Sequence, residues 1–246
     1  MDLGLKGKVA LVTGAGSKRG FGRGIVAVLA KEGCDIIACD IDIKGAEEAA
    51  DEIKNAGGRA IAVKTDITNS GQVKDAIKRA MDEFGRIDIL VNNAGSTQPP
   101  CPFAASTEEK WARDIEINLI GITHFTRAVL PQMSERKNGK IINIASYGAI
   151  IGVPGGSAYS SAKAGVITFT KALAQEVADL DISVNCIAPQ VGDTAFYDDF
   201  PKEVIENFVK SASEAGKSTS PVDVGNTVAF LASDLSRRIM GQCIIL

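Results

Sequence analysis

The sequence predicts an α/β protein in which seven strands form one doubly wound parallel sheet, in the order 3-2-1-4-5-6-7, with helices on both faces. Short apolar runs rich in Val and Ile alternate with helix-length segments along most of the chain, which is typical of β-α-β units. A glycine-rich turn joins the first run to the first helical segment, where strand and helix must pack closely. Because crossovers between parallel strands are right-handed, such units wind outward from the middle of one sheet.

The first four strands are expected over the apolar runs at 8–13, 35–40, 60–66 and 87–93. Amphipathic segments at 20–32, 44–55 and 69–84 separate them and should form helices. The second of these segments is rich in charge and stops before Gly57 and Gly58, which suit a helix end.

The second half of the chain continues the alternation. Acidic residues follow Ser106 and Thr107, which predicts a helix over 106–133, with Pro131 marking or kinking its end. We expect strands at 140–146 and 182–188 around a helix at 157–178. The pattern lapses after Pro189, where a helical insertion at about 190–215 precedes a short helix at 221–231 and a last strand.

Length and composition favour one soluble domain over 1–246. The chain has 246 residues, of which 45% are hydrophobic, enough for one sizeable core. Its net charge of −3 offers no basic surface for nucleic acid or an anionic membrane, so neither partner is expected. Five scattered cysteines and a single histidine predict no metal site and fit a reduced, cytoplasmic setting.

Tyr159 and Lys163 are the first candidate catalytic residues. Four residues apart on the expected 157–178 helix, their side chains stand on one face, one turn from each other. A free tyrosine hydroxyl has a pKa of about 10, and a fixed ammonium nearby would lower that pKa toward neutrality. This spacing therefore predicts that Tyr159 is a general acid/base assisted by Lys163.

Other residues place this pair in a wider pattern. Ser146 ends an apolar run thirteen residues before Tyr159, Asn118 lies in Ile-Asn-Leu further upstream, and Thr13-Gly14 opens the glycine-rich turn. Together they resemble the classical short-chain dehydrogenase/reductase family, from about residue 6 to the C-terminus. The resemblance implies a Rossmann-type sheet and hydride transfer between a nicotinamide nucleotide and a secondary alcohol or ketone. In this scheme Ser146 binds the substrate oxygen and Asn118 anchors a water that relays protons to Lys163, which also binds the nicotinamide ribose.

The glycine-rich turn is the expected pyrophosphate site. It contains Gly14, Gly20, Phe21 and Gly22 between a strand and a helix, where free backbone amides face an anion. Five residues separate Gly14 from Gly20, whereas the family usually has three. We expect the two extra residues to bulge the loop.

Cofactor preference depends on Asp40, which ends the second expected strand. A carboxylate there accepts hydrogen bonds from the ribose hydroxyls and repels a 2′-phosphate, which favours NAD over NADP. Lys18 and Arg19 give the opposite indication, because a basic residue before Gly20 can pair with that phosphate. The carboxylate should dominate, since exposed cations are screened and can turn toward water.

The family resemblance assigns further cofactor contacts. Asp66 and Ile67 would border the adenine, Asn93 and Gly95 would face the ribose, and Pro189 and Thr194 would hold the nicotinamide. The neighbouring Asn92 could be purely structural. After Pro189 the chain departs from the family pattern, with Gln190 in place of a glycine and Gly192 in place of a valine.

The predicted function is thus an oxidoreductase that uses NAD(H) on a secondary alcohol or ketone. One alternative is a 3-oxoacyl-[acyl-carrier-protein] reductase that uses NADP(H), and another is a non-catalytic nucleotide-binding protein. Tyr147, Ile151 and the 190–215 insertion should line the substrate pocket, without identifying the substrate.

The 157–178 helix also bears on assembly. It carries apolar residues on adjacent faces, and related enzymes pair this helix across a two-fold axis. We expect a homotetramer, or a homodimer, whose interface includes this helix through the following residues: Ala158, Ala162, Gly165, Val166, Phe169 and Leu173.

Overall fold

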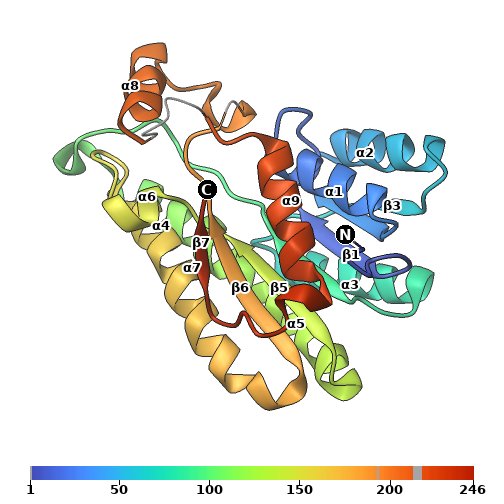
Figure 1. The fold of residues 1–246 in the computed structure, drawn as a ribbon. Helices are drawn as coiled ribbons and strands as arrows, with labels where there is room; N and C mark the ends of the chain where they lie inside the picture. Colours follow the sequence, from blue (N-terminus) through green and yellow to red (C-terminus); the bar gives the residue numbers. More distant parts are fainter. Residues whose placement is uncertain (1, 193, 213–217) are drawn as a thin grey trace.

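The computed structural model describes residues 2–192, 194–212 and 218–246 (Figure 1). Its seven strands form one sheet in the order β3-β2-β1-β4-β5-β6-β7, and every neighbouring pair is parallel, as predicted. The strands are β1 (Val9–Thr13), β2 (Asp35–Asp40), β3 (Ala60–Lys64), β4 (Ile89–Asn92), β5 (Gly139–Ile144), β6 (Ile182–Ala188) and β7 (Cys243–Ile245).

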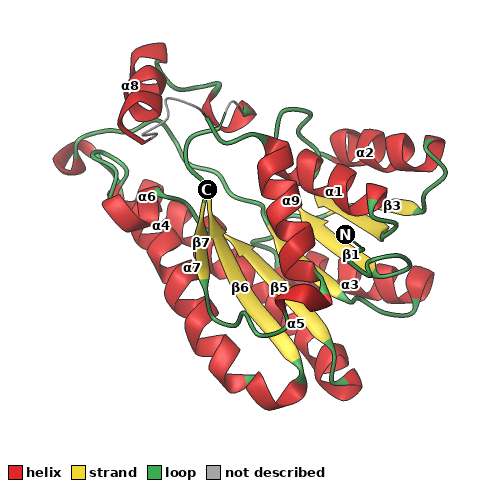
Figure 2. Cartoon of the chain, viewed as in Figure 1, coloured by secondary structure: helices red, strands yellow, loops and turns green. Residues whose placement is uncertain are grey.

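Helices cover both faces of this sheet (Figure 2). One face packs against α1 (Phe21–Lys31), α2 (Ile43–Asn55) and α9 (Pro221–Ala232). The opposite face packs against α3 (Ser70–Phe84), α5 (Gly121–Arg136) and α7 (Ser157–Glu176). The other α-helices of the described residues are α4 (Glu108–Ile115), α6 (Gly148–Ile151) and α8 (Lys202–Ala212).

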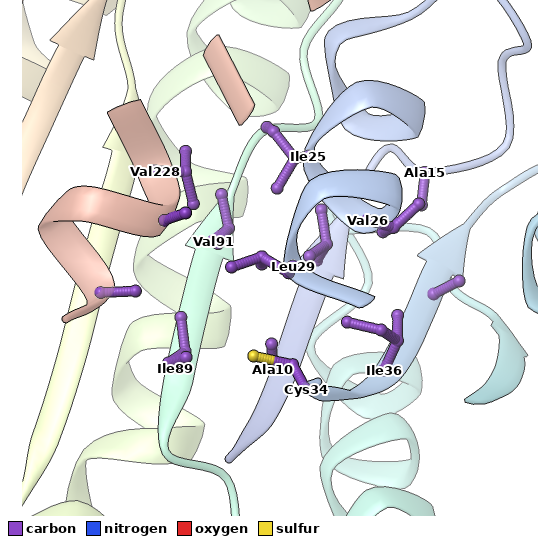
Figure 3. Close-up of a cluster of buried hydrophobic side chains, with 14 of the residues drawn as sticks. Ala10, Ala15, Ile25, Val26, Leu29, Cys34, Ile36, Ile89, Val91 and Val228 are labelled. Carbon is purple, nitrogen blue, oxygen red and sulfur yellow. The ribbon is translucent and has the colours of Figure 1, made fainter. Parts of the chain in front are cut away.

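The core between the sheet and the α1–α9 layer shows why the strands are apolar runs. Strands β1, β4 and β6 are buried along their whole length, so side chains on both faces must be apolar. In Figure 3, Ile25 and Leu29 of α1 lie over Val91 of β4, with Val228 of α9 beside them. Burial on two faces makes the central strands the most strongly specified part of the fold.

The helix predicted over 106–133 is longer and less regular than expected. Helix α4 passes into a π-helical turn at Glu116–Ile120, and α5 continues to Arg136. The prediction that the helix ends at Pro131 is therefore wrong, because Pro131 lies inside α5. A proline removes one backbone donor, but the buried Val129 and Met133 on either side keep this turn packed on the sheet.

The insertion after β6 lies beyond the carboxyl ends of the strands, at the top of Figure 1. It contains a 3₁₀ turn at Ala195–Tyr197 and helix α8, so it is only partly helical. Asp193 and residues 213–217, which include the predicted end of the insertion, lie outside the described residues. Within the described part of the chain, no helix is long and apolar enough to span a membrane.

Candidate active site

Three of the four candidate catalytic residues, Ser146, Tyr159 and Lys163, line one cleft at the carboxyl edge of the sheet. Ser146 follows β5, and its Oγ accepts a hydrogen bond from the Gly148 backbone N–H at 3.1 Å. Lys163 is buried within α7, where its Nζ donates to the Ile144 carbonyl oxygen at 2.9 Å and lies 6.0 Å from the centre of the Tyr159 ring. The structure thus brings the predicted pair and Ser146 together.

The ionisation of Tyr159 differs from the expectation based on Lys163 alone. Burial raises the pKa of the Tyr159 hydroxyl above its ordinary value, the neighbouring Tyr197 adds to the rise, and a hydrogen bond with Ser146 opposes it. Burial also lowers the pKa of Lys163 to about 8. The insertion contributes to the enclosure of Tyr159, since the Phe196 ring lies 5.7 Å from the Tyr159 ring, centre to centre.

Asn118 lies in the π-helical turn, and its side-chain amide is fully engaged by backbone groups. Its Nδ2 donates to the carbonyl oxygens of Ser96 at 2.7 Å and Asp114 at 2.9 Å, and its Oδ1 accepts from the Ser96 N–H at 3.3 Å. A methyl group on Gly95 would lie 2.8 Å from the Asn118 Oδ1 and 3.2 Å from the Lys163 Nζ, so the glycine keeps the space between them open.

The same cleft has a volume of about 480 Å³ and extends along the ends of β1, β2 and β4. This is the switch point of the doubly wound sheet, where open α/β folds bind their ligands. Most predicted cofactor residues line it: Gly14, Gly20, Phe21, Asp40, Asp66, Ile67, Asn93, Gly95, Tyr159, Lys163, Pro189 and Thr194.

Gly22 lies behind the cleft wall and explains how the glycine-rich turn approaches α1. A Cβ atom on Gly22 would lie 2.0 Å from the Gly14 carbonyl oxygen, a backbone atom with no room to move. Gly14 itself has a φ of +69° and would clash with Ala94 if it carried a side chain. These two glycines let the strand, the turn and the helix meet closely at the edge of the cleft.

The two extra residues of the loop are accommodated as a β-turn rather than a distortion of the cradle. The Gly20 N–H donates to the Ser17 carbonyl oxygen at 3.0 Å, which places Lys18 and Arg19 at the tip of the turn. Lys18 pairs with Glu48 of α2 at 3.0 Å, and Arg19 pairs with Asp198 of the insertion. Both cations have carboxylate partners away from Asp40.

Asp40 is fixed at the end of β2. Its Oδ2 accepts from the Gly16 N–H at 2.7 Å and its Oδ1 from the Asp42 N–H at 2.9 Å. The carboxylate therefore shapes the glycine-rich loop while it faces the cleft, a second role that the sequence did not indicate.

Thr13 and the asparagines at the end of β4 hold the strand ends together. The Thr13 Oγ1 accepts from the backbone N–H groups of Asn93 and Ala94, each at 3.0 Å, and the Asn93 Nδ2 donates to the Thr13 carbonyl oxygen at 2.9 Å. Asn92 is buried and donates to Asn143 Oδ1 at 2.8 Å, a structural contact between β4 and β5. The side chain of Asn93 thus serves the backbone as well as lining the cleft.

A smaller cavity of about 70 Å³ adjoins the cleft at Ser146 and Tyr159. Tyr147 and Ile151 line it, as predicted for the substrate pocket, together with aromatic residues of the insertion. The rings of Phe196, Tyr197 and Phe200 pack against one another with centres 5.0 to 6.4 Å apart. The cavity wall is therefore mainly apolar and close to the candidate catalytic groups.

The two segments that depart from the family pattern, the glycine-rich loop and the segment after Pro189, lie in contact. A side chain at Gly192 would lie 2.7 Å from the Phe21 ring, so the glycine makes room for that phenylalanine. The Arg19–Asp198 pair joins the same two segments, with Arg19 shortly before Phe21 and Asp198 shortly after Gly192. The longer glycine-rich loop and the altered segment after β6 therefore form one contact.

Several cleft residues were not predicted: Ser17, Ile41, Thr68, Arg113 and Ile117. Ile41 was the easiest of these to predict, because it is an apolar residue directly after Asp40. In the structure Ile41 is 63% exposed. Arg113 lies on α4, and Ile117 lies in the π-helical turn that follows it.

A doubly wound parallel sheet with a nucleotide-sized cleft at its switch point, and with Ser, Tyr and Lys side chains converging there, defines a class of dinucleotide-dependent oxidoreductases. Residues 8–204 match the family model described as short chain dehydrogenase. The chain belongs to the short-chain dehydrogenase/reductase family, and it is an oxidoreductase that acts on alcohol or ketone groups.

Individual relatives cover nearly the whole chain. The chain is 40% identical over 240 residues to (2S)-[(R)-hydroxy(phenyl)methyl]succinyl-CoA dehydrogenase subunit BbsD of Thauera aromatica, covering 98% of this chain and 95% of the relative. The crystal structure of 3-ketoacyl-(acyl-carrier-protein) reductase from Brucella melitensis complexed with NADH is similar with a TM-score of 0.91 and 36% identity, covering 98% and 97% of the two chains. NAD⁺-bound xylitol dehydrogenase is similar with a TM-score of 0.92 and 29% identity, covering 98% of each chain.

Proposed function

We propose that this protein is an NAD(H)-dependent enzyme that interconverts a secondary alcohol and its ketone. The observation that carries the proposal is the position of Asp40 in the same cleft as Ser146, Tyr159 and Lys163. The glycine cradle around Gly14 and Gly22 fits a dinucleotide, because no side chain could be added there. When bound, the nicotinamide accepts hydride from the alcohol or returns it to the ketone.

The chain's own residues hold the substrate and move its proton. Ser146 donates a hydrogen bond to the reacting oxygen. In oxidation the Tyr159 phenolate takes up the alcohol proton, and in reduction the Tyr159 hydroxyl gives a proton to the ketone oxygen. Lys163, oriented by the Ile144 carbonyl oxygen, places positive charge beside the phenolate that forms. Aromatic residues of the insertion exclude water from these groups, which strengthens each electrostatic contact.

Cofactor choice is supported by charge. The Asp40 carboxylate can accept hydrogen bonds from a ribose diol and would repel a 2′-phosphate. Lys18 and Arg19, the two cations of the glycine-rich loop, are paired with Glu48 and Asp198. Two structural relatives are described with NADH and NAD⁺ bound.

A second candidate is a 3-oxoacyl-[acyl-carrier-protein] reductase that uses NADP(H). Similarity to such reductases, including one that is 36% identical from Thermotoga maritima, favours it. Asp40 opposes the phosphorylated cofactor. A third reading, a nucleotide-binding protein without catalysis, is opposed by the assembled Ser146, Tyr159 and Lys163 side chains, which nucleotide binding alone does not require.

One turnover assay separates these candidates. The purified chain would be tested with NADH and with NADPH against simple ketones, hydroxyketones and 3-oxoacyl thioesters, following absorbance of the reduced nicotinamide. We expect NADH-dependent ketone reduction that is lost in Tyr159→Phe. Exclusive use of NADPH with 3-oxoacyl thioesters would favour the second candidate, and cofactor binding without turnover of any substrate would favour the third.

We also propose that the protein is a cytoplasmic homotetramer. The residues of α7 that suggested assembly are largely used within the subunit, where Ala158, Ala162 and Val166 are buried. Large apolar side chains are instead exposed on α9 and β7, with Val222 at 55% and Ile245 at 49%. Light scattering tests this proposal, because a mass near the 25.8 kDa of one chain at micromolar concentration would exclude it.

A further inference from the structure

Gln190 occupies a fixed position between the cofactor cleft and the substrate cavity, and lines both. It follows β6 and Pro189. Its backbone N–H donates to the Leu246 carbonyl oxygen at 3.0 Å, and the Pro189 carbonyl oxygen accepts from the Tyr147 N–H at 2.9 Å. The backbone at Gln190 is thereby tied to the C-terminus and to the residue that follows Ser146.

The side-chain oxygen of Gln190 is an unpaired buried acceptor. Its Oε1 is shielded from solvent and has no hydrogen-bond partner among the described residues. Buried side-chain oxygens are almost always paired, because leaving one unpaired forfeits the hydrogen bonds it would make with water. An unpaired acceptor in the wall of a binding cavity indicates a donor that arrives with the ligand.

The surrounding cavity limits what that donor can be. Among the residues that the structure describes, none that lines the smaller cavity carries a formal charge at neutral pH, so an ammonium or carboxylate group would meet no ionic partner among them. Tyr197 lines the same cavity, and burial raises the pKa of its hydroxyl to about 12, which keeps it protonated and able to donate. A hydroxyl group is the simplest neutral group that can donate to Gln190 and accept from Tyr197.

We propose that Gln190 is a specificity-determining residue that accepts a hydrogen bond from a second hydroxyl group of the substrate, close to the carbon that is oxidised or reduced. This inference rests on the proposed function and narrows it. The substrates are diols and the corresponding hydroxyketones whose remaining part is apolar, since Ile151, Phe196 and Phe200 form much of the cavity wall. A small cavity beside Ser146 and Tyr159 requires the two oxygen functions to be near each other.

The test uses ketones that differ by one hydroxyl group. Reduction of 3-hydroxybutan-2-one is compared with that of butan-2-one, and 2-hydroxyacetophenone with acetophenone, all with NADH. We expect the hydroxyketone to have at least about tenfold higher kcat/KM in each pair, as one well-placed hydrogen bond provides. In Gln190→Leu this ratio should fall to about one.

Two further variants protect the conclusion. Gln98→Leu makes the same change at an exposed glutamine on the rim of the cavity and should leave the ratio as it is in the unmodified protein. Tyr197→Phe removes the hydrogen bond that the Tyr197 hydroxyl donates to the second hydroxyl group of the substrate. It should lower the ratio of hydroxyketone to ketone kcat/KM, which tests the inference even if Gln190→Leu does not fold.

The outcomes separate the inference from the proposed function. If no ketone is reduced with NADH, the proposed function fails. If ketones are reduced but the ratio is near one in the unmodified protein, only the inference fails. The inference is also rejected if Gln190→Leu raises the KM for NADH and lowers kcat/KM equally for all ketones, since the amide would then serve the cofactor. It is rejected as well if a 3-oxo ester is reduced with higher kcat/KM than the simple ketones while the hydroxyketones are not.

Discussion

Replacing Asp40 by Asn tests the basis of cofactor choice. The substitution keeps a side-chain oxygen for the Gly16 or Asp42 N–H, which hold this residue at 2.7 and 2.9 Å, and removes its negative charge. A carboxylate and a phosphate dianion about 5 Å apart repel by about 1.7 kcal/mol even at the dielectric constant of water, a factor of roughly twenty. The unmodified protein should therefore use NAD(H) with at least about tenfold higher kcat/KM than NADP(H), and Asp40→Asn should remove most of this difference.

Steady-state kinetics with both cofactors and one substrate measures this effect. A second change, Asp198→Asn, should release Arg19 and further raise NADP(H) use when combined with Asp40→Asn, because the cation then lacks its carboxylate partner. Asp198→Asn alone should preserve the NAD(H) preference. Equal use of both cofactors by the unmodified protein would refute the reasoning, since it would mean that Asp40 does not face the 2′ position.

Three other predictions follow from the structure. Tyr159→Phe should lower turnover by about 10²-fold to 10⁴-fold while the Kd for NADH, measured by fluorescence titration, changes little; half of the original activity would exclude Tyr159 as the acid/base. Because burial raises the pKa of Tyr159, alcohol oxidation, which needs the deprotonated form, should accelerate from about pH 6 to about pH 10, whereas ketone reduction, which uses the protonated form, should not; a flat oxidation profile would contradict this assignment. Burial opposes ionisation of Asp88, but hydrogen bonds from the Val9 N–H, Arg136 and Arg86 outweigh it and hold the pKa of Asp88 below its usual value. The ionised Asp88 therefore stabilises the folded protein fully above about pH 4, and this stabilisation is lost as the pH falls through the folded-state pKa. Asp88→Asn should accordingly cost about 2–3 kcal/mol in urea unfolding at neutral pH, while Asp82→Asn, in an exposed pair with Lys78, should barely change the midpoint; equal effects would refute a special role for Asp88.

The sheet could be predicted from sequence because its strands are specified locally. Runs such as Val9–Thr13 and Ile182–Ala188 are buried on both faces, so their continuous apolar character is visible without knowing what covers them. The convergence of Ser146 and Tyr159 followed from the same pattern, since Ser146 comes directly after a strand whose carboxyl end faces the cleft. The winding of the sheet brings the carboxyl ends of its strands to one edge, so a residue that directly follows a predicted strand can be placed at the site.

Other features depend on contacts between distant segments and were missed for that reason. The π-helical turn at Glu116–Ile120 leaves no mark in helical periodicity, because Asn118 meets a partner, Ser96, that is 22 residues away. The raised pKa of Tyr159 likewise depends on Tyr197 and the enclosing insertion. The unpaired oxygen of Gln190 is a property of the assembled cavity, although the departure from the family's glycine pointed to its position.

The contact of Phe21 with Gly192, together with the Arg19–Asp198 pair, makes two loops into a single exchangeable unit. A glycine-rich loop of ordinary length grafted from a relative would remove Arg19 and leave Asp198 unpaired, and a valine at position 192 would collide with the Phe21 ring. Engineering of either cofactor preference or substrate range in this protein should therefore transplant both segments together, because each segment forms part of the surface on which the other packs.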